Sequence, residues 1–274
     1  MTSINTNVGA MIALQNLNAT SSQLQTTQTV ISTGLKVASA KDDGATWAIA
    51  QNQRATASSL DAVKDSMNRA SSVTDVALAA GSQISDLLTQ MQQKALAASD
   101  TSLDTASRSA LNTDFISLRN QITQVVNNAS FNGINLIKNG ATNVAALANS
   151  TGTNVLTVVA QDLSVGGANV TVASTGTIGT VTQATNMITT VQTSINNVSA
   201  SLAKLGTASK SLASNLNFVG KLQDSITAGV GQLVDADLAK ESAKLQALQT
   251  KQQLGIQALS IANQAPQSVL GLFR

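Results

Sequence analysis

The 274-residue sequence contains no cysteine, no histidine and no tyrosine, and it has a single proline. Without cysteine and histidine, the chain has no disulfides, no thiol nucleophile, few routes to a zinc site and no imidazole base. Its carboxylates are scattered, and no hydrolase, metalloprotease or phosphate-binding motif occurs. We therefore expect a protein that is not an enzyme, with no catalytic, cofactor-binding or metal-binding residues.

Aromatic residues and charges are also scarce, at 2% and 11% of the chain. A compact core normally depends on aromatic side chains for buried area. Nucleic-acid binding depends on clustered cations, which a net charge of +2 without a basic run does not supply.

We expect no membrane insertion, because no uncharged apolar run reaches about 18 residues. Residues 1–7 lack the regions of a cleavable signal, so any export is expected to bypass one.

Apolar residues recur at alternating spacings of three and four, which is typical of helices packed on helices. The longest series, from Ile188 to Leu233, has apolar residues at twelve of fourteen positions. A second series runs from Ile49 to Ala95, and a shorter one runs from Leu111 to Val125. These series predict a bundle of long amphipathic helices.

Particular residues are expected at the ends of these helices. Asp43 and Asp104 are predicted to cap the helices that follow them, with Asp42 in a solvated turn. Gly34 is expected near the end of the first helix. Trp47 is expected to pack against a neighbouring helix.

The middle of the chain has a different character, because Asp162 is the only charged residue between Lys138 and Lys204. Residues 154–159 and 168–173 predict two short strands on either side of a pair of glycines. The expected fold is therefore mainly α, a long antiparallel helical bundle or coiled coil with a small β-hairpin insertion.

The two terminal stretches keep the helical spacing but offer few apolar anchors. An isolated helix of this kind is marginal, because ordering its backbone offsets what the anchors contribute. We expect both termini to be disordered in the monomer and to fold against other subunits. The predicted subunit-interface residues are Leu14, Leu17, Leu24, Ile31, Leu35, Leu238, Leu245, Leu248, Ile256, Leu259, Val269, Leu270 and Phe273.

Several blocks carry a family resemblance. SINTN (residues 3–7), ISTGLK (31–36) and SAKDD (39–43) resemble the N-terminal signature of bacterial flagellins, and SFNGINL (130–136) resembles the turn that follows the family's first helices. DADLAKE (235–241) and ANQAPQSVL (262–270) resemble the C-terminal signature. The resemblance covers about residues 1–137 and 184–274.

This resemblance implies a structural subunit that polymerises into the flagellar filament and is secreted unfolded through the flagellar type III apparatus. The implied partners are further copies of the chain, the flagellar cap, the hook-junction proteins and an export chaperone. It also implies five regions. Residues 1–40 and 235–274 form the inner tube, residues 41–130 and 184–234 form the outer tube, and residues 131–183 form an exposed insertion.

Two other functions fit parts of the pattern. A hook–filament junction protein has similar terminal helices but does not form long filaments alone. A coiled-coil signalling module would remain a discrete oligomer at any concentration.

The sequence departs from the family in two places. Residues 42–50 (DDGATWAIA) replace the usual DDAAGLAIA, which introduces Trp47. Residues 90–94 (QMQQK) replace the charged stretch by which the toll-like innate receptor detects flagellins, so weak receptor recognition is expected.

The uncharged insertion is expected either to be covered by neighbouring subunits or to carry O-linked sugars, because exposed uncharged hairpins associate edge to edge. The resemblance to flagellins implies O-linked sugars on Ser and Thr of this region. The candidate O-glycosylation residues are Thr142, Ser150, Thr151, Thr153, Thr171, Ser174, Thr175, Thr177 and Thr180.

Overall fold

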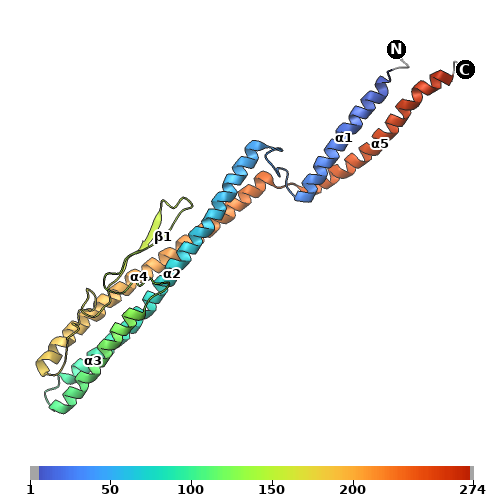
Figure 1. Cartoon of the computed structure of the whole chain (residues 1–274). Helices are drawn as coiled ribbons and strands as arrows, with labels where there is room; N and C mark the ends of the chain where they lie inside the picture. Colours follow the sequence, from blue (N-terminus) through green and yellow to red (C-terminus); the bar gives the residue numbers. More distant parts are fainter. Residues whose placement is uncertain (1–5, 272–274) are drawn as a thin grey trace. The chain divides into compact units, whose positions relative to one another are not determined.

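The computed structural model describes residues 6–271, with side chains described as far as residue 264. This part of the chain holds five helices and two strands (Figure 1). Their bounds are α1 Val8–Thr33, α2 Gly44–Ala98, α3 Thr105–Asn128, β1 Val144–Leu147, β2 Val155–Val158, α4 Val181–Val234 and α5 Leu238–Gly271. The predicted fold class, mainly α with a small hairpin, is confirmed.

The chain divides into two compact units. The terminal unit is the described part of Met1–Ala55 together with that of Ser225–Arg274. The central unit is Thr56–Asp224. Helices α2 and α4 each contribute residues to both units.

The core of the central unit forms along a seven-residue repeat in α4. Side chains at every seventh position are at most 1% exposed, namely Ala184, Val191, Val198, Leu205, Leu212 and Val219. Helix α2 supplies the facing stripe, with Leu60, Val63 and Met67 among its buried residues. The long 3-4 spacings therefore predicted this core, because a repeat of about 3.5 residues keeps one face of a helix against its partner.

Helices α2 and α4 run antiparallel in the central unit. Lys64 Nζ donates a 2.8 Å hydrogen bond to Gln223 Oε1, and Gln92 Nε2 donates one of 2.6 Å to Gln192 Oε1. Between these two links, a Cβ added to Gly81 would lie 2.6 Å from Leu202 Cδ2. The glycine therefore gives Leu202 of the opposing helix room to pack closely.

Helix α3 is fixed at its start by the predicted cap. Asp104 Oδ1 accepts a hydrogen bond of 2.9 Å from the Ser107 N–H, which confirms Asp104 as the N-cap. Buried Arg108 donates to the carbonyls of Ala98, Asp100 and Leu103. It therefore satisfies backbone carbonyls at the end of α2 and in the turn that follows, which have no partner within a helix. Phe115 is the largest fully buried side chain of this helix.

The β prediction was right for one strand and wrong for the other. β2 lies within the predicted 154–159, but 168–173 forms no strand. Its only pairing is an isolated bridge between Val165 and Val170. There the Thr171 N–H donates to Ser194 Oγ of α4 at 3.0 Å, so the backbone bonds to a helix rather than to a sheet.

β2 pairs instead with the antiparallel β1. The sequence of β1 is Val-Ala-Ala-Leu, and its two alanines give it little strand propensity, so the pattern missed it. The loop between the strands is closed by a backbone bond of 2.9 Å from Ala148 to Asn154 and by the Asn149 side chain, which accepts from the Asn154 N–H.

The predicted seams also drift where α2 and α4 enter the terminal unit. Ile49 and Leu233 were expected to be buried but are exposed, and their neighbours Ala50 and Val234 are buried instead. In α3, Val126 rather than Val125 is buried. The reason is geometric, since an α-helix has 3.6 residues per turn and a strict 3.5 repeat loses phase at its ends.

Candidate subunit interface

Helices α1 and α5 lie side by side and antiparallel in the terminal unit (Figure 1). Asn7 Nδ2 donates a 2.7 Å hydrogen bond to the Ala262 carbonyl at one end of the pair. Further along, Gln252 Nε2 donates to Ser21 Oγ at 3.3 Å. The described beginning of α1 therefore pairs with the late part of α5.

The two helices meet along seams of alternating three- and four-residue spacing. The inward positions of α1 are Ala13, Leu17, Thr20, Leu24, Thr27 and Ile31, and those of α5 are Leu245, Leu248, Gln252, Gly255, Leu259 and Ala262. The contact is close at Gly255, where an added Cβ would lie 3.3 Å from Leu17 Cδ1. The pair is thus a two-stranded antiparallel coiled coil.

Polar residues occupy much of this seam. Thr20 and Thr27 are the buried residues of α1, seven positions apart. Thr20 Oγ1 donates to the Asn16 carbonyl at 2.8 Å, but Thr27 Oγ1 has no hydrogen-bond partner among the described residues. A buried hydroxyl without a partner destabilises the packed state. The α1–α5 pair is therefore weaker than an aliphatic seam would make it.

A short junction lies beside the pair in the terminal unit. Gly34 ends α1 in the left-handed conformation expected of a C-cap, with φ of 70°. Residues 34–37 then bond to residues 234–236 through the Lys36 N–H to Val234 carbonyl bond of 2.7 Å and an isolated bridge between Leu35 and Asp235.

A small apolar cluster stabilises this junction. Its buried members are Val37, Ala50, Val230 and Val234, and Trp47 packs against them. The prediction that Trp47 packs against a neighbouring helix is confirmed, because Val230 and Val234 belong to α4.

The connector between α1 and α2 is ordered by two exposed carboxylates. Asp43 Oδ1 accepts from the N–H groups of Ala45 and Thr46 at 3.0 and 3.1 Å, which confirms its predicted cap. Hydrogen bonds from the Thr46 hydroxyl and backbone hold the pKa of Asp43 below its ordinary value of 3.8. The Ser39 N–H and hydroxyl lower the pKa of Asp42 in the same way.

The α1–α5 pair leaves large apolar side chains exposed. Met11 is 64% exposed, Leu14 47% and Ile256 54%. Val8, Ile12, Leu238, Leu254 and Ile261 are also exposed. Such a density of exposed aliphatic side chains on two neighbouring helices marks an interaction surface.

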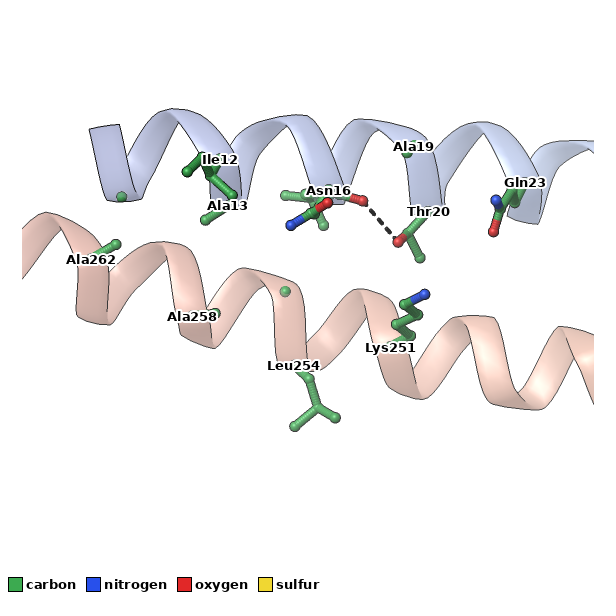
Figure 2. Close-up of a pocket in the computed structure, with 13 residues that line it drawn as sticks. Ile12, Ala13, Asn16, Ala19, Thr20, Gln23, Lys251, Leu254, Ala258 and Ala262 are labelled. Carbon is green, nitrogen blue, oxygen red and sulfur yellow. Dashed lines mark hydrogen bonds between the residues drawn. The ribbon is translucent and has the colours of Figure 1, made fainter. Parts of the chain in front are cut away.

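One side of the pair is hollowed into a groove of about 780 Å³. Its lining includes Ala13, Asn16, Thr20, Gly255, Ala258 and Ala262. Figure 2 shows Ala13, Asn16 and Thr20 directed toward α5, and Lys251 directed toward α1. Helix α1 carries no charged residue, so Lys251 is the only charge lining the groove.

The predicted interface residues divide into three groups. Leu17, Leu24, Ile31, Leu35, Leu245, Leu248 and Leu259 are at least half-buried within the chain itself. Leu14, Leu238 and Ile256 are exposed. Phe273 lies outside the described residues, as do the side chains of Val269 and Leu270.

Sequence reasoning missed the exposed Val8, Met11, Ile12, Leu254 and Ile261. These residues fall outside the 3-4 series, so they carried no signal as core positions. Their signal was instead that they are apolar residues surplus to the seam, and that α1 carries no charged residue.

The described residues hold no cluster of three or more acidic side chains that could bind a metal ion. None of the described helices combines the length and the apolar character needed to cross a membrane.

Two family models match the chain. One is the bacterial flagellin N-terminal helical region, over residues 4–142, and the other is the bacterial flagellin C-terminal helical region, over residues 188–273. Flagellin FljK of Caulobacter vibrioides is 59% identical over 274 residues, which cover 100% of this chain and 99% of the relative. A flagellin of Brucella melitensis is 38% identical over 287 residues and is covered completely.

A solved structure shares the fold. The crystal structure of Bacillus cereus flagellin superimposes with a TM-score of 0.50 at 22% identity, covering 56% of this chain and 88% of that chain.

The partnerless hydroxyl of Thr27 makes the first prediction. Thr27→Val replaces it with a methyl group of similar size and is expected to raise the free energy of unfolding of the α1–α5 pair by about 1 kcal/mol. Amide hydrogen exchange of α1 measures the change. The matched control is Thr26→Val at an exposed position, which should leave exchange unaltered. Equal effects of the two substitutions would contradict the role given to Thr27.

Acid is expected to loosen the start of α2. A depressed carboxylate pKa stabilises the fold above the ordinary value, and this contribution is lost as pH falls through the lowered pKa of Asp43. Protection factors of residues 44–47 should therefore fall as the pH is lowered below the ordinary value of 3.8 and through the depressed pKa of Asp43. In Asp43→Asn, which keeps an acceptor without the charge, this fall should be absent; an unchanged profile would remove Asp43 as the cause.

Proposed function

Since this chain belongs to the bacterial flagellin family, we propose that it assembles through the apolar surfaces that the α1–α5 pair leaves exposed. The chain is a structural subunit of the extracellular flagellar filament. Full-length identity to named flagellins favours this function over a junction protein or a signalling module. The observation that carries the assembly proposal is the exposure of Met11, Leu14 and Ile256 on the surface of the α1–α5 pair.

The location of the two units in the polymer is part of the proposal. Residues 1–40 and 235–274, which belong to the terminal unit, would form the inner tube, and residues 41–130 and 184–234 would form the outer tube. Residues 131–183 would remain as an insertion facing solvent. The contrast between the two cores supports this arrangement. The central unit has a buried aliphatic repeat of its own, whereas the α1–α5 seam mixes aliphatic residues with Thr20, Thr27 and Gln252.

We also propose that the α1–α5 pair is only marginally ordered in the monomer and becomes fully ordered in the filament. Its buried residues in α1 are two threonines, and several of its large apolar residues, including Met11, Leu14 and Ile256, remain exposed. Hydrogen exchange of residues 8–33 should be fast in dilute monomer and slow in filaments. Strong protection of these residues in dilute monomer would contradict the proposal.

The remaining partners are proposals that follow from the family. They are the cap beneath which subunits add, the hook-junction proteins and an export chaperone. No catalytic activity is proposed. Weak recognition by the innate receptor also remains a prediction. In the 90–94 stretch, Met91 is buried. Gln92 donates a hydrogen bond to Gln192, and Lys94 forms an ion pair with Asp114.

O-linked sugars remain a proposal for the insertion. Most candidates are exposed, but Ser150 and Thr177 are half-buried. Thr180 and Gln183 cap the start of α4 reciprocally, so a sugar on Thr180 would disrupt that cap. Exposed Thr142, Ser174 and Thr175 are therefore preferred. Intact mass of natively purified filaments tests this, and a mass equal to that of the bare chain would exclude it.

The assembly proposal is tested at Leu14. Leu14→Lys places a charge on an exposed face, so the subunit should fold but lose polymerisation, because the contact would have to bury the ammonium group. Sedimentation and negative-stain microscopy after seeding measure assembly. The control Leu14→Met keeps an apolar side chain and should form filaments. Normal filaments from Leu14→Lys would place the contact elsewhere.

A further inference from the structure

The α1–α5 pair has two different sides. The groove occupies one side, and its lining does not include Met11, Leu14 or Ile256. Successive residues of a helix are rotated by about 100°, which directs Leu14 of α1 and Ile256 of α5 to the side opposite the groove. We call Met11, Leu14 and Ile256 the ridge. Because the pair is antiparallel, Leu14 and Ile256 lie at nearly the same level along it.

The groove has the dimensions and chemistry to accept aliphatic side chains. Ala13, Gly255, Ala258 and Ala262 line it and leave space unfilled because they are small. The polar residues Asn16, Thr20, Gln23 and Lys251 line the rest of it. Ile12 and Leu254 stand at its margins, and Figure 2 shows Leu254 directed away from α1. The groove contains no acidic group, and the ridge contains no cation that Lys251 would repel.

We propose that the ridge of one subunit packs into the α1–α5 groove of the next copy. This inference rests on the proposed function and names the two surfaces through which the terminal units meet. The occupant is a second copy because the chain belongs to a family of self-polymerising subunits and carries both complementary surfaces on the same two helices.

The pairing of unlike surfaces has a geometric consequence. A contact between two identical patches closes a dimer, whereas a contact between a ridge and a groove leaves one of each unoccupied at the ends. The next copy therefore always finds a free site. This is the type of contact that an open helical polymer requires.

Cysteine cross-linking tests the pairing directly, because the natural chain has no cysteine. One variant carries Ala258→Cys in the groove and another carries Leu14→Cys on the ridge. Filaments grown from an equal mixture are oxidised with copper–phenanthroline and run on a non-reducing gel. The mixture should give covalent dimers, at least about tenfold more than filaments of either variant alone. Met11→Cys serves as a second ridge position if the register excludes Leu14.

The matched control mixes Ala258→Cys chains with Ala19→Cys chains, which place both cysteines in grooves. This mixture should give no dimers. Dimers from the control, or from Ala258→Cys alone, would indicate that grooves face each other and would overturn the inference. Filaments without cross-links at either ridge position would overturn it as well, while leaving the proposed function intact. Failure of the natural chain to polymerise would overturn both.

A second measurement at the same position does not depend on cross-linking. Ala258→Trp fills the groove and is expected to raise the critical concentration for polymerisation by about tenfold or more. Ala258→Ser, of nearly natural size, should leave it within about twofold. Equal critical concentrations for the two variants would show that the groove is not a contact.

Discussion

The weakness of the α1–α5 seam is the constraint on which the rest of the structure depends. Thr20 and Thr27 are the buried residues of α1, while Gly255 lies against Leu17 and Ala262 against Asn7. Small and polar residues allow the helices to approach but contribute little apolar burial. Leu17, Leu24 and Ile31 pack within the pair, but other large apolar residues of the same helices, such as Met11, Leu14 and Ile256, stay exposed. If the seam also buried these residues, the subunit would expose less apolar surface to a neighbouring subunit.

The central unit contrasts with the weak α1–α5 seam, since its core must be stable within each subunit. Its seven-residue repeat from Ala184 to Val219 is buried completely, and Asp104 and Arg108 satisfy the backbone groups where α2 turns into α3. The chain thus separates a bundle with a complete core of its own from a helix pair that, as we propose, is completed by assembly. The lack of aromatic residues fits this division, because thin bundles fill their cores with aliphatic side chains.

The spacing of apolar residues predicted the helices and the central core, because one face of a long packed helix must be apolar at a regular period. The helix ends were predicted from Asp43, Asp104 and Gly34 instead. The spacing did not predict the phase in α1. Leu17, Leu24 and Ile31 fit two series, one with Leu14 and one with Thr20 and Thr27, and only the partner helix decides between them. β1 was missed because its two alanines have little strand propensity. Only Ala146 of the two is buried, and the strand is held to α2 by the Leu147 N–H, which donates to Ser66 Oγ.

The antiparallel pairing of the terminal helices has a kinetic consequence. The hydrogen bond from Asn7 to Ala262 joins residues 255 positions apart in the chain. Contacts of such high order form late, because a long loop must close before they contribute any stability. Helix α1 emerges first but acquires its partner only when nearly the whole chain is available. The topology thus delays the pairing of α1 until its partner helix α5 is available.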